Sequence, residues 1–141
     1  MPKTLETMRE IRARNTTLAF TEERQQAGRC HAPALKAWKQ QGKKIIGYLC
    51  TYVPEELIHA AGMLPARITG DSRELELSEA NSYMYHNCCS FIRSCCELIL
   101  NGHYNFLDGL VVAATCDPTR RLSDVCLNYN LVPLVHALTV P

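Results

Sequence analysis

The sequence predicts an α/β domain with a parallel, Rossmann-like sheet, and two observations carry this prediction. Residues 43–68 show strand, helix and strand patterns in turn, and residues 87–141 add a helix, a strand, a helix and a last strand. Consecutive parallel strands need a crossover helix, and such crossovers are right-handed. We therefore expect half of a doubly wound, three-layer domain with helices on both faces of its sheet.

A helical lead-in, residues 1–42, precedes this domain. A polar helical pattern covers residues 3–28 and carries no motif. Residues 33–41 are typical of a second helix, and Gly42 is suited to end it, because glycine is favoured just after a helix C-terminus. The α/β domain then occupies residues 43–141.

The first strand, helix and strand form a βαβ unit. The strands are predicted over residues 43–50 and 63–68. Between them, Pro54 suits the first helical position, and Glu55 and Glu56 lie in the first turn, where the helix dipole favours negative charge. A unit of this kind implies that its two strands run parallel.

The second half continues the alternation after a polar surface segment at residues 70–80. A helix is predicted over residues 87–101, a strand over 109–115 and a final strand over 131–140. Asp117 begins the helix between these two strands, where we expect its carboxylate to cap the first turn. No helix follows to cover the last strand, so we expect this chain to be the N-terminal part of a longer one, and the alternative is a complete small domain with an edge strand at its end.

Composition favours a globular protein over a nucleic-acid-binding or membrane protein. Hydrophobic residues make up 47% of the 141 residues and charged residues 21%, and the net charge is +1, which leaves no basic excess for nucleic acid. No apolar segment has the length of a signal peptide or a membrane span. We therefore expect a cytoplasmic protein, in which disulfides are rare and cysteines are available for metal or redox chemistry.

Five of the eight cysteines lie within residues 86–117. Cysteine is among the most buried residue types, so packing is its simplest use. Most of these five share one helical stripe that predicts core packing: Cys88, Ile92, Cys95 and Ile99, with Cys96 beside it. The spacing C-x-x-C does not occur, which argues against a zinc ribbon or a thioredoxin-like site.

Cys89 and Cys116 are interpreted as ligands instead. Cys89 lies near the start of the helix at residues 87–101, where the helix dipole lowers the pKa of a thiol and favours the thiolate that metals bind. Cys116 follows the strand at residues 109–115, and ligands bind at the carboxyl ends of strands in open α/β sheets. The local pattern alone leaves packing open as the alternative for both.

Three stretches together resemble one known family: residues 47–65 (GYLCTYVPEELIHAAGMLP), 89–93 (CSFIR) and 108–117 (DGLVVAATCD). It is the family of 2-hydroxyacyl-CoA dehydratases and benzoyl-CoA reductases, of the type of the 2-hydroxyglutaryl-CoA dehydratase D-component. The end of the chain, residues 133–141, is similar to the strand with which the family's first domain ends. The resemblance covers residues 43–141.

The resemblance implies an iron–sulfur enzyme component. By position it makes Cys89 and Cys116 two of three cysteines that hold the iron of a 4Fe-4S cluster, with the third outside this sequence; such clusters are bound by thiolates. It also implies a homologous second subunit in a heterodimer, an ATP-dependent iron–sulfur activator protein and an acyl-CoA substrate. The fragment alone is expected to be inactive.

Glu56 matches the acidic position of the family's motif after the first strand. The resemblance gives it a role as a base or in orienting substrate. Its position alone predicts only a carboxylate that stabilises a helix start by about 0.5 kcal/mol. Cys50 and Thr51 end the neighbouring strand, so we expect them to line the same crevice.

The reaction implied is the radical elimination of water from a 2-hydroxyacyl-CoA after one-electron reduction, catalysed by a lyase of anaerobic metabolism. A benzoyl-CoA reductase-type subunit, or a related double-cluster reductase, is the alternative within the family. The alternative from another class is a non-catalytic cytosolic α/β module whose cysteines only pack.

Overall fold

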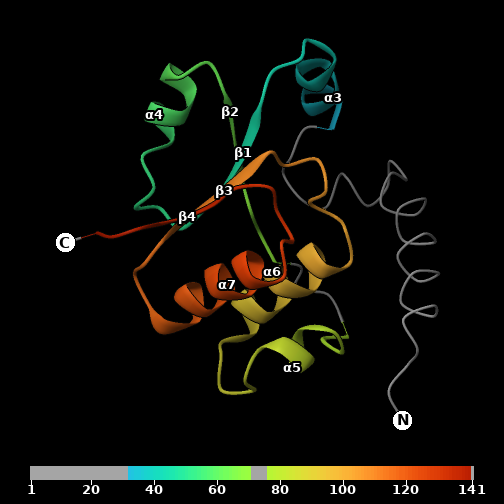
Figure 1. Cartoon of the computed structure of the whole chain (residues 1–141), viewed down its shortest axis with the longest axis vertical. Coiled ribbons are helices and arrows are strands. Elements are labelled where there is room, and N and C mark those ends of the chain that lie inside the picture. Colours follow the sequence, from blue (N-terminus) through green and yellow to red (C-terminus); the bar gives the residue numbers. More distant parts are fainter. Residues whose placement is uncertain (1–31, 71–75, 141) are drawn as a thin grey trace.

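The computed structural model describes residues 32–70 and 76–140, which form one parallel sheet with helices on both faces (Figure 1). In these two ranges the strand order is β2-β1-β3-β4, and every neighbouring pair is parallel. The predicted fold class, a parallel α/β domain, is confirmed. The helical pattern predicted at residues 3–28 lies outside the described residues.

Each helix and strand predicted within the described residues is present; the four strands and the helix predicted over residues 87–101 are shorter than predicted, whereas the helix predicted over residues 33–41 is shifted by one residue. The elements are α3 (Ala32–Gln40), β1 (Ile45–Leu49), α4 (Glu55–Ala60), β2 (Leu64–Arg67), α5 (Ala80–Tyr83), α6 (Ser90–Leu100), β3 (Gly109–Ala113), α7 (Asp117–Asn128) and β4 (Val135–Leu138). The helix α5 was not predicted, because a helix of only four residues is too short to show helical periodicity. Among the described helices, none has the length and apolar character needed to cross a membrane.

The central strand β1 is buried along its whole length. Ile45 and Leu49 belong to the larger core cluster, whereas Ile46 and Tyr48 belong to a smaller cluster on the other face. Gly47 lies between them, and a Cβ atom built there would be 2.6 Å from Leu107 Cδ1. The absence of a side chain at this position therefore lets Leu107 pack directly on the strand.

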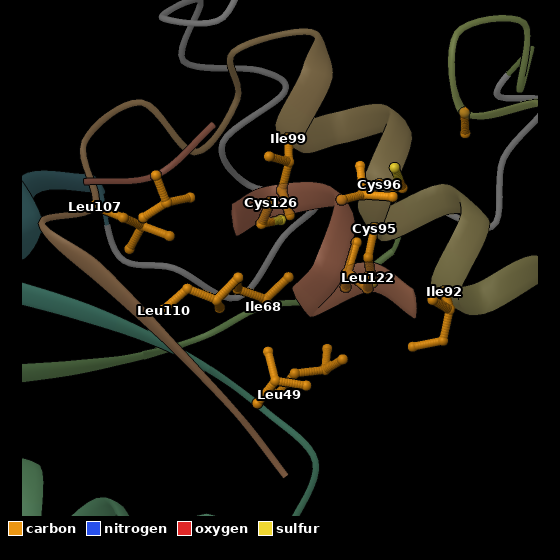
Figure 2. Close-up of a cluster of buried hydrophobic side chains, with 14 of the residues drawn as sticks. Leu49, Ile68, Ile92, Cys95, Cys96, Ile99, Leu107, Leu110, Leu122 and Cys126 are labelled. Atoms are coloured by element: carbon orange, nitrogen blue, oxygen red, sulfur yellow. The ribbon is translucent and has the colours of Figure 1, made fainter. Parts of the chain in front are cut away.

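The larger core lies between the sheet and the helices α6 and α7. Figure 2 shows Cys95 and Cys96 of α6 and Cys126 of α7 in one cluster of buried side chains above the sheet. Each of the three is 0% exposed, and burial is the main cause that raises the pKa of each thiol to about 12. The packing role predicted for Cys95 and Cys96 is therefore confirmed.

The helix α3 is attached to the amino edge of the sheet through Asp108. The Asp108 carboxylate accepts hydrogen bonds from the Ile45 N–H group at 2.8 Å, from Lys39 Nζ at 2.7 Å and from Lys44 Nζ at 3.3 Å. Burial alone would raise the pKa of Asp108, but these bonds outweigh burial and lower it below the ordinary value. Trp38 and α3 are thereby held beside β1 and the chain that enters β3.

We expect the fold to lose stability as the pH rises above about 9, through the three buried thiols. Folding raises the pKa of each from 9.0 to about 12, so between these values the unfolded chain has lost protons that the folded chain keeps. Each thiol then lowers the free energy of unfolding by about 1.4 kcal/mol per pH unit, and has no such effect at lower pH.

Urea denaturation at several pH values between about 8 and 10 measures this slope. The variant Cys126→Ala serves as the control, since it lacks one titrating thiol and should show a shallower slope at any absolute stability. Identical slopes in the two proteins would contradict the expectation.

Candidate functional site

The carboxyl edge of the sheet collects the first turns of three helices. Because the strands are parallel, a helix that directly follows a strand begins at this edge, as α4 does after β1 and α7 after β3. The helix α6 lies beside α7 on the same face and leads into β3, so its first turn also points to the carboxyl edge (Figure 1). The sites predicted from the sequence lie at these helix starts.

Cys89 is the residue that precedes α6. Its backbone is extended, with φ −60° and ψ 147°, and its side chain makes no capping hydrogen bond to the helix. The residue is exposed, in contrast to its neighbour Cys88, which is 7% exposed and packs in the core. The fold therefore buries one thiol of this adjacent pair and presents the other to solvent.

Cys116 holds the same position before α7, and it too is exposed. The Thr119 hydroxyl donates to the Cys116 carbonyl oxygen at 2.7 Å and accepts from the Cys116 N–H group at 3.4 Å. The thiol lies 3.5 Å from the same hydroxyl. The prediction that Asp117 caps this helix is wrong, because the extended backbone of Cys116 places the cap there and makes Asp117 the first helical residue.

Cys50 terminates β1 in a left-handed conformation, with φ +78°. Its Sγ atom lies 3.6 Å from the hydroxyl oxygen of Thr115, the residue before Cys116. Burial raises the pKa of the Cys50 thiol, but hydrogen bonds from the Tyr52 backbone, the Thr115 hydroxyl and Thr51 outweigh burial, and the net shift is downward. Hydrogen bonds of this kind favour a thiolate at the end of the central strand.

The ends of β1 and β3 thus place Cys50 next to the segment that carries Cys116. In the two described ranges, no three side chains of His, Cys, Asp or Glu come together in an arrangement that could hold a metal ion. Among the cysteines of these ranges, Cys89 and Cys116 are the exposed ones.

A pocket of about 290 Å³ lies at the start of α4, on the opposite face of the sheet from α6. Its lining includes Tyr48, Thr51, Glu55, Glu56 and Arg67. Two residues predicted for a crevice, Thr51 and Glu56, therefore meet here. Sequence reasoning missed Tyr48 and Arg67, although strand alternation places Tyr48 on the face to which α4 returns.

The Tyr48 hydroxyl donates a hydrogen bond to Glu55 in this pocket. Burial of Tyr48 is the main cause that raises its pKa to about 12, and the hydrogen bond and negative charge of Glu55 raise it further, while Arg67 acts in the opposite direction. The hydroxyl thus remains protonated and holds one of the two adjacent carboxylates.

Known proteins match the part of the chain that contains these candidate site residues. Residues 50–141 match the family described as 2-hydroxyglutaryl-CoA dehydratase, D-component. The chain is 36% identical over 105 residues to the (R)-2-hydroxyglutaryl-CoA dehydratase beta subunit of Acidaminococcus fermentans, a match that covers 74% of this chain and 27% of that protein.

Two further relatives have similar identity. The (R)-phenyllactyl-CoA dehydratase beta subunit of Clostridium sporogenes is 40% identical over 96 residues, which are 68% of this chain and 24% of that protein. A benzoyl-CoA reductase subunit of Thauera aromatica is 39% identical over 92 residues, which are 64% of this chain and 24% of the relative. The chain thus spans about a quarter of the length of the curated relatives it matches.

The phenolate absorbance of the folded chain is expected to include a late step with a pKa of about 12 from Tyr48. Absorbance read immediately after a jump to high pH, before unfolding, measures this step. Tyr48→Phe should remove it. Glu55→Gln should shift it toward the ordinary value of 10.0, because the variant removes a negative charge beside the phenol. Tyr52→Phe, at an exposed residue of the same pocket, is the matched control. A late step that survives Tyr48→Phe would refute the assignment.

Proposed function

This chain belongs to the 2-hydroxyglutaryl-CoA dehydratase D-component family, and from that premise we propose that it is the iron–sulfur part of an enzyme that removes water from a 2-hydroxyacyl-CoA. The observation that carries the proposal is the pair Cys89 and Cys116. Both are exposed thiols at helix starts on the carboxyl side of one sheet, and both lie within the residues that match the family.

The donor set fits an iron–sulfur cluster in its chemistry. Iron of such clusters is bound by cysteine thiolates, and the fold separates cysteines that pack from cysteines that remain accessible to iron. Within residues 32–70 and 76–140, the cysteines that pack in the core are Cys88, Cys95, Cys96 and Cys126. We propose that Cys89 and Cys116 hold the iron of a 4Fe-4S cluster, together with a third cysteine from outside this sequence.

When bound, such a cluster supplies single electrons to the acyl-CoA thioester. The pocket at the start of α4 supplies the groups that move protons. Tyr48 donates to Glu55 and fixes its carboxylate, and this leaves Glu56 as the pocket carboxylate that we assign to proton transfer or to orienting the substrate. Cys50 and Thr51, at the end of β1, would line the space between pocket and cluster.

The names of the relatives support a multi-subunit enzyme, because each name contains the word subunit. We propose a homologous second subunit that forms a heterodimer with this one, and an ATP-dependent iron–sulfur activator that delivers the electron. Since the chain spans about a quarter of the length of its relatives, we infer that the 141-residue chain alone is inactive.

A benzoyl-CoA reductase-type subunit is the second candidate. Identity to the benzoyl-CoA reductase relative is 39%, against 36% and 40% for the two dehydratase beta subunits, so identity does not rank the two reactions. Both reactions use an acyl-CoA thioester, and that substrate class follows from either choice. We place dehydration first because the segment GYLCTYVPEE resembles that side of the family.

Anaerobic addition of ferrous iron and sulfide to the reduced chain is expected to slow the alkylation of Cys89 and Cys116. Thiolates bound to iron cannot react with iodoacetamide, so both rates should fall by about tenfold or more. Peptide mass spectrometry after timed quenching gives the rate at each thiol. Cys89→Ala should abolish the protection of Cys116, whereas Cys126→Ala, at a packing thiol, should preserve it. The same measurement in the assembled enzyme, which supplies the third cysteine, decides the proposal, and unchanged rates at both thiols there would refute it.

In an assembled enzyme that carries this domain, we expect Glu56→Gln to lower turnover by about 10²- to 10⁴-fold, the usual contribution of a general acid or base. Glu55→Gln is the matched control, because Glu55 lies in the same turn but is engaged by Tyr48. Its effect on turnover should be much smaller. Turnover is measured at equal iron content, and small, equal effects at the two positions would show that Glu56 only stabilises the helix start.

A further inference from the structure

Glu97 is a buried carboxylate in the middle of α6, with 2% of its surface exposed. One carboxylate oxygen accepts a hydrogen bond from the Ala80 N–H group at 2.7 Å, and the other accepts from Asn101 Nδ2 at 3.1 Å. Ala80 is the first residue of α5 and is itself 0% exposed, so its N–H group has no partner within its own helix. Glu97 thus supplies the acceptor that a buried helix start requires.

Arg93 lies one turn before Glu97 on α6 and binds the same segment. Its guanidinium donates to the Asn81 side-chain oxygen and, at 3.4 Å, to the His86 carbonyl oxygen. Its backbone N–H group donates to the Cys89 carbonyl oxygen at 3.1 Å, which is the ordinary i to i−4 hydrogen bond of the first turn of α6. The Arg93 side chain therefore holds the chain where the turn begins at His86, and the helix itself holds it at Cys89.

Together Glu97 and Arg93 form what we call the α6 clamp. The clamp binds the first two residues of α5, Ala80 and Asn81, and also binds His86 in the turn that follows. Met84, before His86, and Cys88, after it, pack into the core. Figure 1 shows α5 beside α6, on the side away from the sheet. The backbone that leads into Cys89 is consequently fixed by side chains of the helix that Cys89 opens.

We propose that Glu97 and Arg93 are positioning residues for Cys89. This inference rests on the proposed function, in which Cys89 is a ligand. The role that it gives to the clamp is to hold the Cys89 thiol in a fixed direction. A cluster ligand needs such support, because side chains that bind metals are oriented by the groups around them.

Residue-resolved alkylation of the reduced 141-residue chain without iron tests the clamp. Glu97→Leu leaves the buried Ala80 N–H group without an acceptor, and Arg93→Met removes the guanidinium hydrogen bonds to Asn81 and His86. Both variants should open the segment locally, which should raise the alkylation rate of the buried thiol Cys88 by about tenfold or more. Cys126 and Cys116 should change by less than about twofold. These two thiols are measured in the same sample and report whether the rest of the domain remains folded.

Two further variants serve as controls that should behave like the wild-type protein. Glu97→Gln should stay close to the wild-type protein, because its amide oxygen accepts from Ala80 while its amide nitrogen donates to a rotated Asn101 side chain. Arg121→Met removes an exposed arginine that pairs with Asp117 on α7 and should leave Cys88 unchanged. An equal rise at Cys88, Cys95 and Cys126 in Glu97→Leu, or no rise at any thiol, would overturn the proposal.

Repeating the alkylation with ferrous iron and sulfide tests whether the clamp positions Cys89 for iron binding. Iron should protect Cys89 in the wild-type chain and in Glu97→Gln, and should fail to protect it in Glu97→Leu and Arg93→Met. Undiminished protection in the last two variants would overturn a positioning role. A lack of protection of wild-type Cys89 in the assembled enzyme, which supplies the third cysteine, would instead refute the proposed function, and the rates without iron would still show whether the clamp holds the segment.

Discussion

The parallel pairing of β1 with both β2 and β3 is the constraint on which the rest of this domain depends. It requires crossovers, and these place the helices antiparallel to the strands with their first turns at one edge of the sheet. No additional loop is then needed to hold functional side chains at that edge. Each residue between a strand and its helix is already held by a rigid element on either side, as Cys116 is between β3 and α7.

Side chains of one type differ in pKa and in role according to how deeply they are buried and what they contact. The thiols of Cys95, Cys96 and Cys126 lie in the core with a raised pKa, whereas Cys50 has a lowered one because hydrogen bonds at the end of β1 outweigh its desolvation. The carboxylates divide in a similar way. Glu97 is buried and used to join two helices, while the pocket carboxylates at the start of α4 stay exposed.

Periodicity was sufficient to predict the sheet and its main helices, because strand and helix patterns are local. It extended the last strand to residues 131–140, whereas β4 covers Val135–Leu138. Val132 explains the difference, since it is buried in the core from a loop and so has the hydrophobicity of a strand residue without the pairing. Apolar patterns report burial, and burial extends beyond the paired residues.

The candidate site was less accessible from the sequence. Cys89, Cys116, Glu56 and Thr51 were identified from motif and position, and their roles stay predictions. The contacts that support them join side chains whose proximity no local pattern encodes. The bond from Ala80 to Glu97 spans 17 residues, and it exists only because α5 folds back on α6.

The contacts of Asp108 also bear on how such a domain could be inherited. The residues that match the family begin at position 50, yet Asp108 binds Lys39 of α3 as well as Lys44 and the first residue of β1. The physical unit therefore begins before the residues that match the family model. A recombination event that moved only residues 50–141 would leave an aspartate, half-buried at the amino edge, without its two lysines and without the central strand that it binds.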